Sequence, residues 1–504
     1  MVALLLSIGL LCAFMIAYYA RGGVVVIALL ANLFFLIGTL ASIGNGNDTA
    51  WYCRHRTYSS PLRWMPMQLS TNVSVKKFAR ALPDIRLLPL VSSALPAIID
   101  ANITTLLTAM VLMYFGLGPI KGFGTVLLVG IISSMFTAIL VARLITDWWA
   151  ERTEMNYSLP WSKDVLANVD YDWIGKRKYA YIFSGALILF GFFNFATRGF
   201  ELGVDFKGGY SFDVQFENTV DVNALRSSLG EAFGGNPVVK SVSTENTYNI
   251  TTSYLSDDTG SDVMNRVIAK LDEGINNAGI KTDAENFKNT DGTGTHIISS
   301  SQVGPTVADD IRASSFKAGI WALVLIFLYL LVRFRRWQFS LGAVMALTHD
   351  VLITLAFFSF LHGMVPFSLE IDQAIIACIL TVIGYSVNDT VIVYDRIREF
   401  IQTFSGQDKH IVFNKAINST LTRTLITSGT VIMVALLLFV FGGQATKGFA
   451  FGMLIGMIFG TYSSIFVASS FVVDLTKERI LSGKSVGAST ESTSSKGGKK
   501  KVNA

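Results

Sequence analysis

Asp389 and Asn388 lie inside a long apolar run that continues on both sides of them. The flanking residues 374–380 and 391–393 are apolar, and the whole run is long enough to cross a bilayer as a helix. An aspartate inside a span costs roughly 2.5–3.5 kcal/mol on insertion scales, which favours a functional role. We expect Asp389 to carry a proton or an ion within the membrane. The alternative is a charge near the cytoplasmic end that reaches the lipid headgroups.

Other polar residues also lie at or near membrane depth. His349 and Asp350 are adjacent within an apolar run, and they could extend a proton path or form a structural hydrogen-bonded pair. Arg423 opens a further run, where the alternative to a functional role is an ordinary positive-inside anchor. Asp100 and Asn102 stand near the start of another run, and they could instead cap a helix.

The elements that hold these residues must be membrane helices. Of the 504 residues, 51% are hydrophobic and 15% are charged, a composition that indicates a polytopic membrane protein and excludes a soluble enzyme. The net charge of +5 gathers in short loops and in the C-terminal tail, so it gives no support for nucleic-acid binding. Apolar spans are expected at about 1–19, 24–43, 97–116, 122–146, 178–197, 315–333, 341–361, 372–394, 424–442 and 449–474.

The long polar region 200–310 is expected to be a small folded domain outside the cytoplasm. Placing the basic clusters in the cytoplasm gives alternating crossings and leaves this region on the other side. Its segments follow the order β-α-β-β-α-β, which predicts a ferredoxin-like α+β sandwich. The segments are 209–216, 220–233, 238–242, 248–254, 262–277 and 296–299.

An internal repeat is visible at a constant offset. Lys121-Gly-Phe123 recurs as Lys447-Gly-Phe449, and Val141-Ala142 recurs as Val467-Ala468. Each match is weak, but the shared register and hydropathy predict two homologous halves of one helical bundle, as in many transporters.

With these motifs in view, the chain resembles the bacterial protein-export factors SecD and SecF in their fused form. The SecF-like part carries Leu202-Gly-Val-Asp-Phe-Lys-Gly-Gly209, Ala346-Leu-Thr-His-Asp350 and the most specific match, Gly384-Tyr-Ser-Val-Asn-Asp-Thr390. The SecD-like part is represented from its second span onward, with Ile99-Asp-Ala-Asn-Ile-Thr-Thr105 as its clearest signature. The resemblance implies a bundle of the RND-superfamily type in the bacterial cytoplasmic (inner) membrane.

That resemblance also implies a role and its residues. Members of the family assist the SecYEG channel and the SecA ATPase, with YajC as a further partner, and they act on exported unfolded polypeptide. A membrane aspartate and an arginine of SecF take part in proton passage, and the matching positions are Asp389 and Arg423. Asn388, His349, Asp350 and Asp100 are secondary candidates. We expect no enzyme activity, no cofactor and no metal, with H⁺ as the coupling ion and sodium as the alternative.

Residues 45–92 do not fit this pattern. A SecD half requires a span with Val-Asp-Ala-Asn here, whereas Asn47 to Tyr58 cannot cross a bilayer. Permitted codons for Arg63 to Met67 spell Val-Asp-Ala-Asn in another reading frame. We therefore interpret 45–92 as a frame-shifted stretch of the coding DNA.

These observations divide the chain and leave two rival functions. The predicted parts are 1–149, a SecD-like transmembrane part; 150–177, a cytoplasmic linker; 178–199, the first SecF-like span; 200–310, the extracytoplasmic domain; 311–476, the SecF-like bundle; and 477–504, a disordered basic cytoplasmic tail. One rival is a proton-coupled exporter of small molecules or lipids. The other is a scaffold of the translocase that conducts no protons.

Overall fold

The computed structural model describes most of the chain. The described residues are 2–18, 22–43, 88–142, 144–145, 148 and 169–476, the last range with short gaps at 236, 242–245, 257, 259, 261, 290–293, 363, 366 and 405. The predicted tail 477–504, linker residues 150–168 and residues 45–87 of the interpreted frame shift lie outside them. Helix α5 begins at Leu88, so residues 88–92 of that stretch are helical.

Every predicted apolar span is a helix. Seven helices are long and apolar enough to cross a membrane, and three shorter apolar helices lie at Leu5–Tyr18, Val25–Ile37 and Asn102–Phe115. The helices of the ten spans are α1 (Val2–Tyr18), α2 (Gly22–Ile43), α5 (Leu88–Phe115), α6 (Pro119–Phe136), α8 (Arg177–Arg198), α13 (Pro305–Phe334), α14 (Trp337–Leu361), α15 (Gln373–Thr403), α16 (Lys409–Phe441) and α17 (Gln444–Ser463), the last followed by α18 (Ser469–Leu475).

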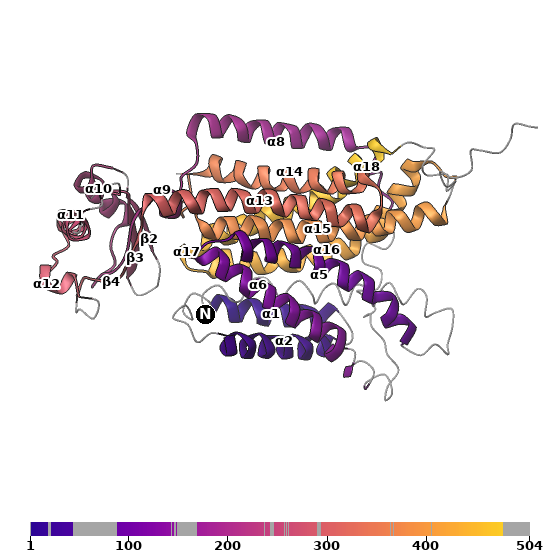
Figure 1. Ribbon diagram of the computed structural model, residues 1–504, viewed down its shortest axis with the longest axis horizontal. Helices are drawn as coiled ribbons and strands as arrows, with labels where there is room; N and C mark the ends of the chain where they lie inside the picture. The colour runs from indigo at the N-terminus through magenta and orange to yellow at the C-terminus, as the bar shows by residue number, and fades with distance from the viewer. Residues whose placement is uncertain are drawn as a thin grey trace, which may run out of the picture.

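Helix α15 is the centre of the bundle. The most apolar window of α15 is 89% buried, against 22% for α8, which lies at the upper edge of the molecule (Figure 1). Helix α15 packs against α5, α14, α16 and α17. A polar side chain within the apolar part of α15 is therefore enclosed by protein on nearly every side.

The two halves of the bundle repeat one another. Helices α5 and α6 pack as a pair, as do α16 and α17. Each pair ends in a short π-helical turn, η1 (Thr137–Val141) after α6 and η2 (Ser464–Ala468) after α17. Helix α13 packs against α5, and α1 packs against α16. The predicted two-halved bundle is thus confirmed.

Outside the bundle stands the predicted ferredoxin-like domain, at the left in Figure 1. Its four-stranded sheet has the order β2-β3-β1-β4 with antiparallel neighbours, and α10 packs against α11. Alternate residues of β1, including Phe212 and Val214, enter the apolar core. The elements are β1 (Gly209–Gln215), α10 (Val222–Phe233), β2 (Val238–Ser241), β3 (Thr247–Thr252), α11 (Val263–Asn277), α12 (Ala284–Phe287) and β4 (His296–Val303).

The domain is joined to the outer end of α15. Leu202 forms a parallel bridge with Ile371, just before α15 begins, and the short helix α9 (Val204–Lys207) follows. Lys240 of β2 donates to Glu370 Oε2 at 2.8 Å. The base of the domain is therefore bonded to the segment that leads into the central helix.

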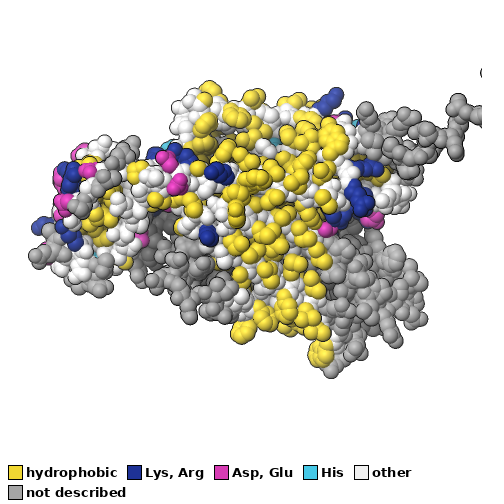
Figure 2. Space-filling view, viewed as in Figure 1, with side chains coloured by type: hydrophobic (Ala, Val, Ile, Leu, Met, Phe, Trp, Pro, Cys, Tyr) yellow, Lys and Arg dark blue, Asp and Glu magenta, His cyan; other side chains and the backbone are white. Residues whose placement is uncertain are grey.

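Hydrophobic side chains form a broad band across the bundle, whereas charged side chains gather on the domain and at the opposite end (Figure 2). Exposed large hydrophobic residues of the bundle helices include Phe190, Phe316 and Ile182. Such a band is typical of a surface in contact with lipid.

Candidate functional site

Asp389 lies on the face of α15 that packs against α16. Its side chain is 5% exposed, and Ser428 Oγ donates to its Oδ2 at 2.7 Å. Thr427 Oγ1 lies 3.5 Å from its Oδ1. Asp389 is therefore enclosed between two helices.

Arg423 is on the same helix as Ser428 and Thr427. Thr427 Oγ1 donates to the Arg423 carbonyl at 3.0 Å, one helical turn along α16. Since α16 begins at Lys409, Arg423 is inside the helix and not at its start. Arg423 is thus on α16, about one turn from the two α16 residues that contact Asp389 of α15, and on the side away from the domain.

Asn388 lies on a different face of α15. It follows Gly384 by one turn, and a Cβ on Gly384 would lie 3.2 Å from Thr108 Oγ1 of α5, so this face approaches α5 closely. Asn388 is 4% exposed, and its Oδ1 has no hydrogen-bond partner among the described residues. Asn388 and Asp389 therefore face different halves of the bundle.

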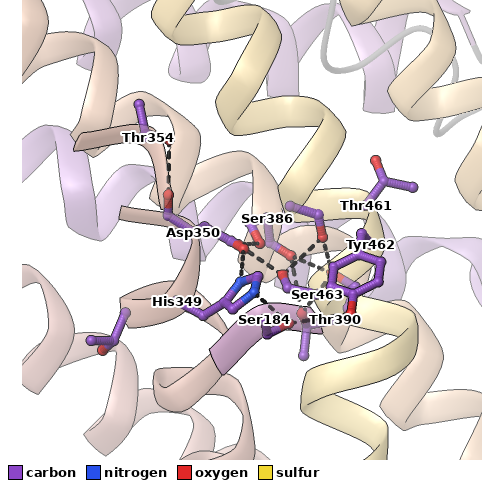
Figure 3. Close-up of polar contacts among 12 residues, drawn as sticks. Ser184, His349, Asp350, Thr354, Ser386, Thr390, Thr461, Tyr462 and Ser463 are labelled. Carbon is purple, nitrogen blue, oxygen red and sulfur yellow. Dashed lines mark hydrogen bonds and ion pairs between the residues drawn. The ribbon is translucent and has the colours of Figure 1, made fainter. Parts of the chain in front are cut away.

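His349 and Asp350 form a hydrogen-bonded pair between α14, α8, α15 and α17 (Figure 3). His349 Nδ1 lies 3.0 Å from Asp350 Oδ1, and Asp350 is fully buried. Asp350 Oδ2 accepts from Ser386 at 2.6 Å and from Ser463 at 2.9 Å. The pair is thus part of a polar cluster separate from the Asp389 contacts.

Asp100 is an ion-pair partner and does not cap a helix, because α5 begins at Leu88. Arg333 of α13 donates through Nε to Asp100 Oδ2 at 2.6 Å. Its Nη2 also bonds Asp395 Oδ2 of α15 at 3.1 Å, and Tyr329 donates to Asp100 Oδ1 at 2.9 Å. The expectation that Asp100 caps a helix is wrong, and Asp100 instead joins the two halves through Arg333.

A carboxylate such as Asp389 can bind and release a proton. When ionised, it is stabilised by the Ser428 hydroxyl; when protonated, it is neutral and is retained in the membrane at lower cost. Among the described residues, no group of three or more His, Cys, Asp and Glu side chains could hold a metal ion.

Sequence comparison identifies the family. The family model described as "Protein export membrane protein SecD/SecF, C-terminal" matches residues 78–152 and 282–478, and the model of the SecD/SecF GG motif matches residues 193–220. The protein translocase subunit SecF of Rhodothermus marinus is 44% identical over 312 residues, which are 62% of this chain and 95% of that protein. The chain belongs to the SecD/SecF family.

Two further SecD/SecF proteins extend the match beyond SecF. The protein translocase subunit SecDF of Brucella abortus is 32% identical over 389 residues, which cover 75% of this chain and 47% of that protein. The crystal structure of SecDF, a translocon-associated membrane protein from Thermus thermophilus, superposes with a TM-score of 0.76 at 26% identity. The match covers 94% of this chain and 61% of that one.

The chain is thus a multi-pass protein of the bacterial cytoplasmic membrane and an accessory component of the Sec translocase. Its named relatives are translocase subunits.

Proposed function

We propose that this SecD/SecF protein uses proton movement through Asp389 to promote the late stages of protein export. The single observation that carries the proposal is a carboxylate, Asp389, buried in the central membrane helix. Its partners would be the SecYEG channel, the SecA ATPase and YajC, and its substrate an unfolded polypeptide that emerges from the channel. One elementary charge that crosses 100 mV supplies about 2.3 kcal/mol, so a few protons could drive a modest movement.

The proposed cycle has two states. Ionised Asp389 accepts the Ser428 hydrogen bond and attracts the positive charge of Arg423. Protonation neutralises Asp389 and removes that attraction, so α15 and α16 adopt a second arrangement. Because α15 begins next to the base of the domain, a shift of α15 would reach the domain that grips the emerging chain.

Asp389→Asn tests the proposal, because it keeps the size of the side chain and removes its proton chemistry. Export of a signal-bearing precursor should fall about tenfold or more, to the level of cells depleted of their own SecD and SecF, and the remainder should not respond to an uncoupler. The matched control is Asp309→Asn, whose side chain is 72% exposed and which should export normally. Full export by Asp389→Asn would contradict the proton-driven function and favour the scaffold function.

A further inference from the structure

Among the residues that the structure describes, no charged group forms an ion pair with the His349–Asp350 pair from outside it. Asp350 Oδ1 lies 3.0 Å from His349 Nδ1, and the side chains are 0% and 5% exposed. Among the described residues, no Lys or Arg forms an ion pair with Asp350. The neighbouring helices contribute only uncharged groups to the pair: Ser184 from α8, Ser386 from α15, and Tyr462 and Ser463 from α17.

The contacts of the pair suit two protonation states. With one proton bound, an imidazolium donates from Nδ1 to Asp350 and from Nε2 to Ser184 Oγ, which lies 3.0 Å away. After the proton leaves, neutral His349 keeps its Nδ1–H on the carboxylate, and Nε2 accepts from the Ser184 hydroxyl. Ser184 can also exchange a hydrogen bond with Tyr462 Oη at 3.2 Å. No contact has to break in either state.

The contacts of the other carboxylate oxygen, Asp350 Oδ2, also persist in both states. Ser463 Oγ donates to Asp350 Oδ2 at 2.9 Å, and the carbonyl of Gly460 lies 3.1 Å from the same hydroxyl. Because Asp350 is ionised in both states, the hydrogen bond from Ser463 is kept in both. Only hydroxyl groups need to turn, and a hydroxyl rotor can serve as either donor or acceptor.

We propose that His349 and Asp350 form a second proton-binding site of the SecF-like half, distinct from Asp389, and that Ser386 transmits its state to α15. The inference rests on the proposed function, since it assigns a further step to the same proton-driven movement. The site binds one proton: the pair is neutral overall when the proton is bound and carries one negative charge when it is absent. The proton leaves through the Nε2 side, toward Ser184.

The link to Asp389 runs along one rigid helix. Ser386 donates to Asp350 at 2.6 Å, and Asp389 follows Ser386 by about one turn of α15. Thr390 Oγ1 bonds the Ser386 carbonyl and lies 2.9 Å from Ser464 Oγ of η2. The Ser386 bond is made in both states, but it is stronger when the pair carries its net negative charge. The charge of the pair therefore acts on the helix that carries Asp389 and on the adjoining π turn.

Nitrogen NMR of the histidine rings tests proton binding directly. The full chain is labelled with ¹⁵N-histidine and reconstituted in bilayers, and His349→Gln identifies the His349 signal among the five histidines. We expect the His349 ring to change from the neutral to the doubly protonated pattern as the pH is lowered. The change should differ in Asp350→Asn, because that variant removes the carboxylate that faces Nδ1. A ring that keeps one protonation state at every pH at which the protein stays folded would overturn the proposal.

Export measurements test the role of the site. His349→Gln and Asp350→Asn should each lower proton-driven export about tenfold. Ser184→Ala should alter the dependence of export on pH. The matched control is Thr348→Val, which neighbours His349 on α14 and bonds only the Val344 carbonyl. Full export with an unchanged pH profile in His349→Gln contradicts the proposal.

The experiments distinguish the function proposed for Asp389 from the proton site proposed at His349 and Asp350. In Asp389→Asn, the His349 signal should still titrate, because the site does not use that carboxylate. If His349 titrates while Asp389→Asn exports normally, the function proposed for Asp389 is wrong and the second proton site stands. If Asp389→Asn is inactive and His349 does not titrate, the inference about the pair is wrong.

Discussion

Arg333 holds two acidic side chains that belong to different halves of the bundle. The side chain of Asp100 is 12% exposed, and those of Arg333 and Asp395 are 24% and 33% exposed. The planar guanidinium group of arginine suits this arrangement, because its separate N–H groups can donate to two carboxylates in fixed directions. The cluster therefore joins α5, α13 and α15 through charge.

Removing this cation should cost stability. Arg333→Gln leaves Asp100 and Asp395 partly buried without their countercharge, and breaking a buried pair costs roughly 3–5 kcal/mol, less where water reaches it. We expect a lower thermal midpoint of the detergent-solubilised protein. Arg335→Gln, at an exposed neighbouring arginine, should leave the midpoint unchanged. Equal midpoints for the two variants would contradict a stabilising role of the cluster.

The sequence identified the titratable residues of the site but not their partners. Asp389 is recognisable because a carboxylate in an apolar run is costly, whatever surrounds it. Ser428, Ser386 and Ser463 were missed, since serine is common in membrane helices and gives no signal until a distant helix is placed beside it. Arg333 had the appearance of one more cytoplasmic basic residue, and only the fold brings it to Asp100.

Among the elements, the contact between β2 and the segment before α15 is one direct link between domain and bundle. Burial alone would lower the pKa of Lys240, but the charges of Glu370 and Asp372 outweigh this effect and raise it. A raised pKa means that the charge-dependent stability is complete below the ordinary value of 10.5 and is lost only as pH rises through the higher value. The contact should therefore persist at neutral pH.

Lys240→Met should loosen the domain. The variant removes the cation that faces Glu370, so amide hydrogen exchange in β2 and in residues 368–372 should quicken about tenfold. Lys281→Met, at an exposed lysine of the same domain, provides the comparison. Exchange that is the same in both variants would mean that Lys240 does not hold the domain in place.

Helix limits were harder to predict than helix positions. Helices α15 and α16 extend beyond the apolar runs because polar residues continue the helix outside the hydrocarbon layer. Asp408 caps α16 by accepting from the backbone N–H of His410 at 2.7 Å, and Asp372 caps α15 through the N–H of Ile375 at 2.9 Å. Hydropathy detects only the apolar part of such a helix.

Across the whole molecule, the arrangement fixes which ends lie on the same side of the membrane. The domain stands at one end of the bundle, and the loop between α15 and α16 lies at the other (Figure 1). The ten apolar helices and the order of strands and helices along the domain were predictable, because long apolar runs and alternating strands have strong periodicity. The pairing of α13 with α5 was not, since a run of apolar residues does not specify its neighbour.

Cysteine labelling in intact cells tests this orientation. Glu273→Cys, on the exposed face of α11, should react with a maleimide that reaches the periplasm but does not cross the cytoplasmic membrane. Gln407→Cys, exposed between α15 and α16, should react only after the membrane is opened. The reverse pattern would place the domain in the cytoplasm.

A π turn occurs in each half of the bundle. A π turn contains more residues than an α turn, so each of η1 and η2 corresponds to a residue inserted into a regular helix. The turns lie at Thr137–Val141 and Ser464–Ala468, within one residue of the constant offset that relates the two halves. The wider turn therefore recurs at the same place in each half, and the internal symmetry of the bundle includes this irregularity as well as the regular helices.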